Sequence, residues 1–118
     1  MSEVTNGSEV LSRLMSAALV RDRVLAENIA NQNVPGYQRR VVSFEELLRQ
    51  RIDAGRTHAD VKPLISIDKL SPAGPDGNNV SLELETNTMR ENRLTYEMYA
   101  AMLQARLGMT QSAITESR

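Results

Sequence analysis

The chain of 118 residues contains no cysteine and no tryptophan, and it has one phenylalanine, three tyrosines and a single histidine. The absence of cysteine excludes disulfides and thiol chemistry. The lone His58 has neither a cysteine nor a second histidine near it, so it does not form a zinc-site pattern. With few aromatic side chains, one compact core would be thin, because small chains bury proportionally little surface. The composition favours long helices that pack together or against neighbouring chains.

Other absences exclude whole classes of function. No run of about 18 apolar residues occurs, so no transmembrane helix is predicted. The 14 basic and 15 acidic residues nearly cancel, which disfavours nucleic-acid binding. Residues 1–7 lack a basic region followed by an apolar run, so no cleaved signal peptide is expected. A glycine-rich phosphate loop, paired metal ligands and a nucleophile elbow are also missing, so we predict no enzyme, no cofactor, no metal and no small-molecule ligand.

Long segments near both ends of the chain have helical apolar spacing. We expect a disordered segment at residues 1–7 and an N-terminal helix over residues 8–33. A C-terminal helix is expected over residues 81–118, with Ser81 as its N-cap and acidic residues in its first turn. The predicted fold is mainly α: an antiparallel, coiled-coil-like pair of terminal helices within one helical domain, residues 8–118.

The N-terminal helix carries two apolar stripes. The stronger one is interrupted at Arg21 and Asp22; its members are Leu11, Leu14, Met15, Ala18, Leu25 and Ile29. The weaker one comprises Val10, Ala17, Val20 and Val24. The stripes either widen one buried face or serve two faces, one of them toward a neighbour, and the spacing leaves both open. The C-terminal helix has a heptad at Leu82, Met89, Tyr96 and Leu103.

The middle segment, residues 34–80, is rich in turn residues and is expected to be mostly loop. A short helix is predicted over residues 44–52, with Ser43 and Glu46 as its capping box. Short extended stretches are predicted at residues 41–42 and 63–70, as a strand or hairpin. The charged clusters at residues 39–40 and 49–51 are expected on the surface, where they could also contact acidic partners. Capping explains the paired carboxylates Glu45-Glu46 and Glu83/Glu85.

Residues 28–37 mark the end of the N-terminal helix. Pro35 has no N–H and disfavours helical geometry at Val34, and Gly36 can adopt positive φ. The asparagines at this end are good partners for loose backbone groups. On local chemistry alone this is an ordinary helix C-terminus.

The same residues carry a family resemblance. Asn28, Ala30 and Asn31, followed by Pro35, Gly36 and Tyr37, resemble the N-terminal signature of bacterial flagellar rod, hook and hook-associated proteins. Val34 stands where that signature has threonine. A second motif precedes the C-terminal helix: Asp76, Gly77, Asn78, Asn79 and Val80. With the short length, it makes the chain similar to the proximal rod members of the family. The resemblance spans nearly the whole chain, most weakly over residues 49–75.

The resemblance implies a structural subunit of the flagellar basal-body rod that self-assembles through its terminal helices and transmits torque. It implies contacts with copies of itself, other rod subunits, basal-body adapter and inner-membrane ring proteins, and the export gate. It also implies a periplasmic location, reached through the flagellar type III export apparatus without a cleaved signal. By the same analogy, Asn28 and Asn31 should bind backbone groups at the helix end.

Apolar surface left over by the shorter N-terminal helix is the expected subunit interface, which comprises Leu11, Leu14, Met15, Leu103, Leu107, Met109 and Ile114. An alternative function is a soluble helical hairpin that docks one partner helix and regulates it. Such a regulator would form a small defined complex and would not polymerise. An enzyme would need a cleft with converging polar groups.

Overall fold

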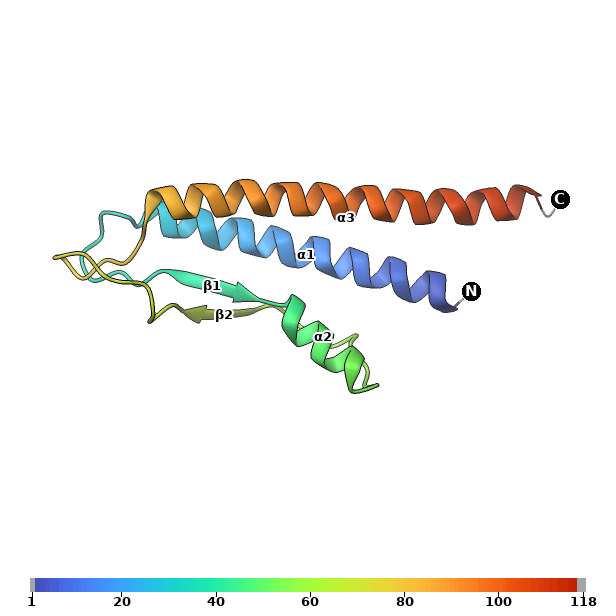
Figure 1. Cartoon of the computed structure of the whole chain (residues 1–118), viewed down its shortest axis with the longest axis horizontal. Coiled ribbons are helices and arrows are strands. Elements are labelled where there is room, and N and C mark those ends of the chain that lie inside the picture. Colours follow the sequence, from blue (N-terminus) through green and yellow to red (C-terminus); the bar gives the residue numbers. More distant parts are fainter. Residues whose placement is uncertain (1, 117–118) are drawn as a thin grey trace.

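The computed structural model of the chain describes residues 2–116, with side chains from residue 7 onward (Figure 1). Its elements, in order, are α1 (Ser2–Ala30), β1 (Arg40–Ser43), α2 (Glu45–Asp53), β2 (Leu64–Ile67) and α3 (Leu82–Glu116). Helices α1 and α3 run side by side in opposite directions, so the two termini lie at the same end. This confirms the mainly α fold, with an antiparallel helix pair and a loop-rich middle segment that contains a short helix and a pair of strands.

The helix boundaries differ in detail from the predicted ones. Helix α1 begins at Ser2 and ends at Ala30, and turns follow it. The expected disorder of residues 1–7 in the free chain stays a prediction. At the start of α3, the Ser81 Oγ accepts the N–H of Leu84 at 3.3 Å, which confirms the predicted N-cap. Residue 1 and residues 117–118 lie outside the described part of the chain.

Helix α3 faces α1 with positions spaced alternately four and three residues apart, the spacing of a coiled coil. We call this set the inner seam; it comprises Glu85, Met89, Asn92, Tyr96, Tyr99, Leu103, Arg106 and Thr110. All of its members are buried or half-buried. Asn92 donates its Nδ2 to the Ala18 carbonyl of α1 at 2.7 Å, and Arg106 lies against Gly7. Leu82, a member of the predicted heptad, is 49 % exposed instead.

The largest apolar cluster lies on the other side of α1, against the middle segment. Phe44, Leu48 and Val61 pack there onto Ala17 of α1, with Val10, Leu14 and Leu47 at the margin. Helix α1 is therefore sandwiched between α3 and the middle segment (Figure 1). Both stripes of α1 contribute to this cluster, Val10 and Ala17 from the weaker one and Leu14 from the stronger one.

The predicted capping box of α2 is wrong. Ser43 is the last residue of β1, the N-cap position belongs to Phe44, and no side chain caps the helix there. Phe44 is only 1 % exposed, so its burial in the core sets where the chain turns into α2.

The strands form an antiparallel pair in which Arg40 lies opposite Ile67, and Ser43 opposite Leu64. The connection between them carries α2. Strand β1 lies toward α1, and β2 lies on the far side of β1 (Figure 1). The predicted extended stretches thus become one two-stranded sheet with an inner and an outer edge.

Candidate functional site

The two sequence motifs meet at the corner where α1 ends and α3 begins. The Gly36 N–H donates to the Asp76 carbonyl at 2.9 Å, and the Asn79 N–H donates to the Tyr37 carbonyl at 3.3 Å. Residues 28–37 and 76–80 therefore form one local structure, although 38 intervening residues separate them in sequence. We refer to this structure as the corner. The resemblance rested on two separate motifs, and the fold joins them.

Two glycines allow the two segments of the corner to approach each other closely. Gly36 and Gly77 have φ angles of 75° and 85°, a region that other residues rarely adopt. A Cβ atom on Gly77 would lie 3.4 Å from the Cα of Gly36. The positive φ expected at Gly36 is therefore present, and Gly77 adds a steric reason for glycine.

Asn78 binds two carbonyls of the turn that follows α1. Its Nδ2 donates to the Asn31 and Val34 carbonyls at 2.9 and 2.8 Å, and its Oδ1 accepts the Val80 N–H at 2.8 Å. Asn31 turns its own Nδ2 back to the Glu27 carbonyl at 2.7 Å. The bonds of Asn78 therefore connect the turn after α1 to the segment that leads into α3, and Asn31 adds a second donor to a carbonyl in the last turn of α1.

Asn28 binds β1 in the way that a neighbouring strand would. Its Oδ1 accepts the Arg40 N–H at 2.9 Å, and its Nδ2 donates to the Arg40 carbonyl at 2.9 Å. The Tyr37 hydroxyl donates to the same Oδ1 at 3.1 Å. Asn28 is completely buried, and burial is tolerated because its polar atoms are hydrogen-bonded. The bonds expected for Asn28 and Asn31 are thus present, to different elements.

Asn79 lies between the extensions of the two strands. The Asp68 N–H donates to the Arg39 carbonyl at 2.9 Å, as in an ordinary ladder. The return bond is replaced by the Asn79 side chain, which accepts the Arg39 N–H at 2.6 Å and donates to the Asp68 carbonyl at 2.8 Å. The sheet is therefore connected to the segment that leads into α3.

A buried ion cluster completes the corner. The Arg39 Nε lies 2.5 Å from Glu85 Oε1, and its Nη1 lies 2.6 Å from Asp68 Oδ2. Glu85 is completely buried and also accepts a bond of 3.2 Å from Asn28. Buried charges are tolerated only when they are paired and hydrogen-bonded. The cluster ties α1, the sheet and α3 to one another.

The environment of Asp68 strongly favours its ionised form. The Ser71 hydroxyl donates to Oδ2 at 2.6 Å, and the N–H groups of Leu70 and Ser71 donate to Oδ1. The Ser71 hydrogen bond and then Arg39 hold the pKa of Asp68 well below its ordinary value. The hydrogen bond to Glu85 likewise raises the pKa of Arg39.

The ion cluster contradicts two predictions. Arg39 was expected on the surface, and Glu85 was assigned to capping, yet both are buried. The spacing of Glu85 could have indicated its burial, because it lies four residues before Met89 and therefore in the inner seam. A charged residue in that position needs a buried partner. Nothing in the sequence distinguishes Arg39 from its exposed neighbour Arg40.

A second ion pair holds the start of α2. Arg21 binds both carboxylate oxygens of Glu45 at 2.7 Å, and its Nη2 also donates to the Val42 carbonyl at 3.1 Å. The hydrogen bond from Arg21 lowers the pKa of Glu45. Arg21, which interrupts the apolar stripe in the sequence, therefore connects α1 to β1 and α2.

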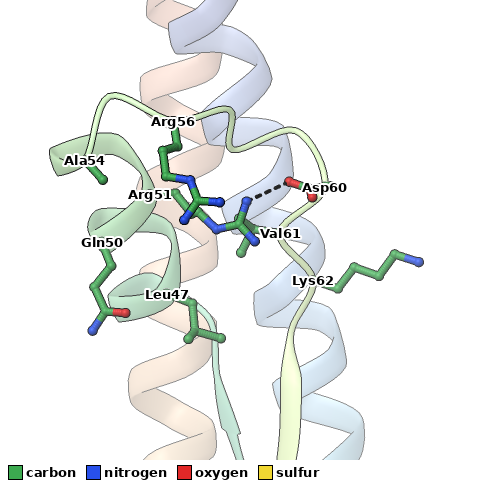
Figure 2. A pocket seen from close by; sticks show the side chains of 8 residues that line it. All are labelled: Leu47, Gln50, Arg51, Ala54, Arg56, Asp60, Val61 and Lys62. Carbon is green, nitrogen blue, oxygen red and sulfur yellow. Dashed lines mark hydrogen bonds and ion pairs between the residues drawn. The ribbon is translucent and has the colours of Figure 1, made fainter.

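A second surface feature is a hollow beside α2 (Figure 2). It lies between α2 and the loop that follows it, and two of its charged groups bind each other: Arg51 pairs with Asp60 at 3.2 Å and also donates to the Thr57 carbonyl. Figure 2 shows Lys62 pointing away from α2. Within residues 2–116 no cluster of three or more histidines and carboxylates could hold a metal ion.

The remaining predicted site residues are distributed over the molecule. Ala30, at the end of α1, and Pro35 are exposed, as is Val34 at 45 %. Of the expected interface, Leu11 is buried, and Leu14, Met15 and Leu103 are half-buried. The other three members are exposed: Leu107, Met109 and Ile114. In the described part of the chain, no helix is long and apolar enough to cross a membrane.

Comparison with known proteins identifies relatives along most of the chain. No protein-family model matches it. A protein of Bacillus subtilis is 26 % identical, and the match covers 98 % of each chain. One of Escherichia coli is 29 % identical over 74 % of this chain and 77 % of its own, and one of Borrelia hermsii is 28 % identical over 77 % and 82 %. All three are described as the flagellar basal body rod protein FlgB.

Proposed function

Since the chain belongs to the FlgB type of flagellar basal-body rod proteins, we propose that it is a structural subunit that builds the rod through its terminal helices. Its relatives are rod proteins and not enzymes, in agreement with the prediction of a non-enzymatic chain.

The main support is a second seam on α3, which we call the outer seam. It repeats the alternating four- and three-residue spacing and comprises Leu94, Met98, Ala101, Ala105, Gly108 and Ser112. With 3.6 residues per turn, these positions lie opposite the inner seam. All are exposed, and Leu94 and Met98 are 67 and 52 % exposed. Apolar and small residues in heptad spacing suit close packing by another helix.

A flank of the inner seam on α3 also carries Met102 and Met109, which are 47 and 66 % exposed. Methionine adapts to irregular neighbouring surfaces. Beyond the contact between Gly7 and Arg106, Leu107 and Ile114 continue the α1-facing side of α3 and are each 56 % exposed. A large exposed apolar surface usually marks an interaction site. We assign the outer seam and this end of α3 to neighbouring subunits.

Transmission of torque requires that the two helices keep a fixed relation under load. The corner supplies this relation, because its hydrogen bonds and its buried ion cluster join α1, the sheet and α3. As a rod subunit the chain would meet copies of itself and other rod proteins, and at the base of the rod the adapter, the inner-membrane ring and the export gate. It would reach the periplasm through the type III apparatus.

Substitutions on the outer seam test the proposal. Met98→Glu and Ala105→Glu place a charge in the seam, at positions that are exposed in the free subunit. Burial of one apolar side chain is worth about 1.5–3 kcal/mol, so each charge should block assembly and leave the monomer folded. The matched control is Gln104→Glu, on the same helix outside the seam.

We expect both seam variants to keep the circular dichroism of the wild type while they fail to enter purified basal bodies, and Gln104→Glu to enter normally. Normal swimming and incorporation of both seam variants would refute an assembly role for this surface. A defined complex with a single helical partner, without polymerisation, would support a regulatory hairpin instead.

A further inference from the structure

The two edges of the small sheet differ in whether other parts of the chain cover them. The edge of β1 toward α1 is covered, since Asn28 binds both backbone groups of Arg40 and Arg21 binds the Val42 carbonyl. Strand β2 supplies the other edge, and it lies on the far side of β1 from α1 (Figure 1).

The alternating hydrogen-bond pattern of the antiparallel pair shows which backbone N–H and C=O groups of β2 point away from β1. Because the Asp68 N–H donates to the Arg39 carbonyl, and Arg40 lies opposite Ile67, the pair of Arg40 and Ile67 is a non-hydrogen-bonded pair. By the same alternation, Ile65 and Ile67 direct their N–H and C=O groups away from β1. No hydrogen bond from another part of residues 7–116 reaches these outward groups.

The side chains of β2 are apolar and exposed as well. Leu64, Ile65 and Ile67 are 54, 42 and 52 % exposed. Ile65 and Ile67 line an open hollow together with Ser66, Arg40 and Lys69. Backbone groups without partners beside exposed apolar side chains are the features that an added strand uses, the backbone for affinity and the side chains for specificity.

Three cations surround this edge: Lys62 before β2, Lys69 after it, and Arg40 on β1. None of them forms an ion pair within the described residues. Figure 2 shows Lys62 extending away from α2. A bound segment with acidic residues at its ends would neutralise these charges.

The same cations argue against a second copy as the occupant. In a parallel pairing of two β2 strands, each lysine would lie beside its counterpart. In the antiparallel pairing that matches Ile65 with Ile67 of the second copy, Lys69 would lie opposite Pro63 of that copy, one residue away from its Lys62. Like charges that are close across strands are destabilising.

We propose that the outer edge of β2 binds an extended segment of another protein, apolar at alternate positions and acidic at its ends, as a third strand of the sheet. This surface is separate from the outer seam of α3, and the inference does not rest on rod assembly. Loss of incorporation by the seam variants and loss of strand binding by β2 variants are therefore independent results.

The test uses the full chain and two short synthetic peptides of alternating valine and threonine. One peptide ends in acidic residues and the other in lysines, and binding is measured by fluorescence anisotropy of the labelled peptide. We expect the acidic peptide to bind at least about tenfold more tightly than the basic one. In the variant Lys62→Glu/Lys69→Glu this preference should reverse.

Backbone pairing is tested with proline. Ile67→Pro removes an outward N–H and takes no hydrogen bond from the pair with β1, whereas the control Ile67→Thr keeps that N–H. We expect Ile67→Pro to weaken acidic-peptide binding by at least about tenfold, and Ile67→Thr to bind with nearly wild-type affinity. Equal binding of the two peptides, or no effect of Ile67→Pro, would overturn the proposal. So would a dimer in sedimentation velocity that Ile67→Pro abolishes, because the occupant would then be a second copy.

Discussion

Arg39 and Glu85 stand 46 positions apart in sequence, yet the Arg39 Nε lies 2.5 Å from Glu85 Oε1 in the buried corner. This pair connects the start of the sheet to the first turn of α3. A buried charge without a partner is far less favourable than a buried pair, so the two residues depend on each other.

We predict that Arg39→Met destabilises the chain by about 3–5 kcal/mol, because it leaves Glu85 charged and unpaired. The double variant Arg39→Met/Glu85→Leu should recover much of that loss, since the fully buried charge of Glu85 is removed as well and Asp68 keeps its hydrogen bonds from Leu70 and Ser71. The control Arg49→Met removes the exposed pair with Glu46 and should change the stability by about 0–1 kcal/mol. Urea unfolding followed by circular dichroism measures all three. Equal effects of Arg39→Met and Arg49→Met would contradict the account.

The pH dependence of stability follows from the two carboxylates with lowered pKa values, Asp68 and Glu45. A carboxylate whose pKa is lower in the folded state contributes stability above its unfolded pKa and loses it as the pH falls through the folded pKa. The urea midpoint should therefore decrease below about pH 5. Asp68→Asn and Glu45→Gln should each be less stable than wild type at pH 7, and the difference should shrink in acid. A difference that stays constant from pH 7 to pH 3 would show that neither ionised group stabilises the fold.

The glycines of the corner give a prediction with an internal control. Gly36→Val forces a branched residue into positive φ and should destabilise the chain by about 1–2 kcal/mol. Gly108 lies within α3, and a Cβ there would meet nothing within 4 Å. Gly108→Ala should therefore stabilise the monomer by about 0.5–1 kcal/mol. Thermal unfolding distinguishes the two, and stabilisation by both would mean that the turn at Gly36 is not strained.

Normal motility of Asn31→Leu/Gly36→Val would show that the corner is dispensable for assembly.

Hydrogen exchange in dilute monomer tests the ends of the helix pair. We expect weak protection at residues 2–7 and 111–116, and strong protection around Ala17 and Ala18, which are buried between α3 and the middle segment. Strong protection of both ends in the monomer would refute the predicted disorder of residues 1–7 in the free chain.

Apolar spacing and turn residues predicted the helix pair, the short helix and the turn at Gly36, because these depend on neighbours along the chain. The motifs likewise drew attention to Asn28, Asn31, Asn78 and Asn79, but not to the contacts that join the two motifs. The rest could not be predicted, since it depends on contacts distant in sequence. Asn79 binds Arg39 across 40 positions, and Arg21 binds Glu45 across 24. Arg39 and Arg40 look alike in sequence, and only the position of the sheet relative to α1 decides which of them is buried.

The central claim is that this polypeptide is part of the flagellar rod. Its most direct test is deletion of the gene, with swimming scored in soft agar and the protein content of purified wild-type basal bodies determined by mass spectrometry. The account predicts a non-motile deletion strain, recovery by the wild-type gene, and this polypeptide among the basal-body proteins. Normal swimming of the deletion strain, together with absence of the polypeptide from intact basal bodies, would contradict it.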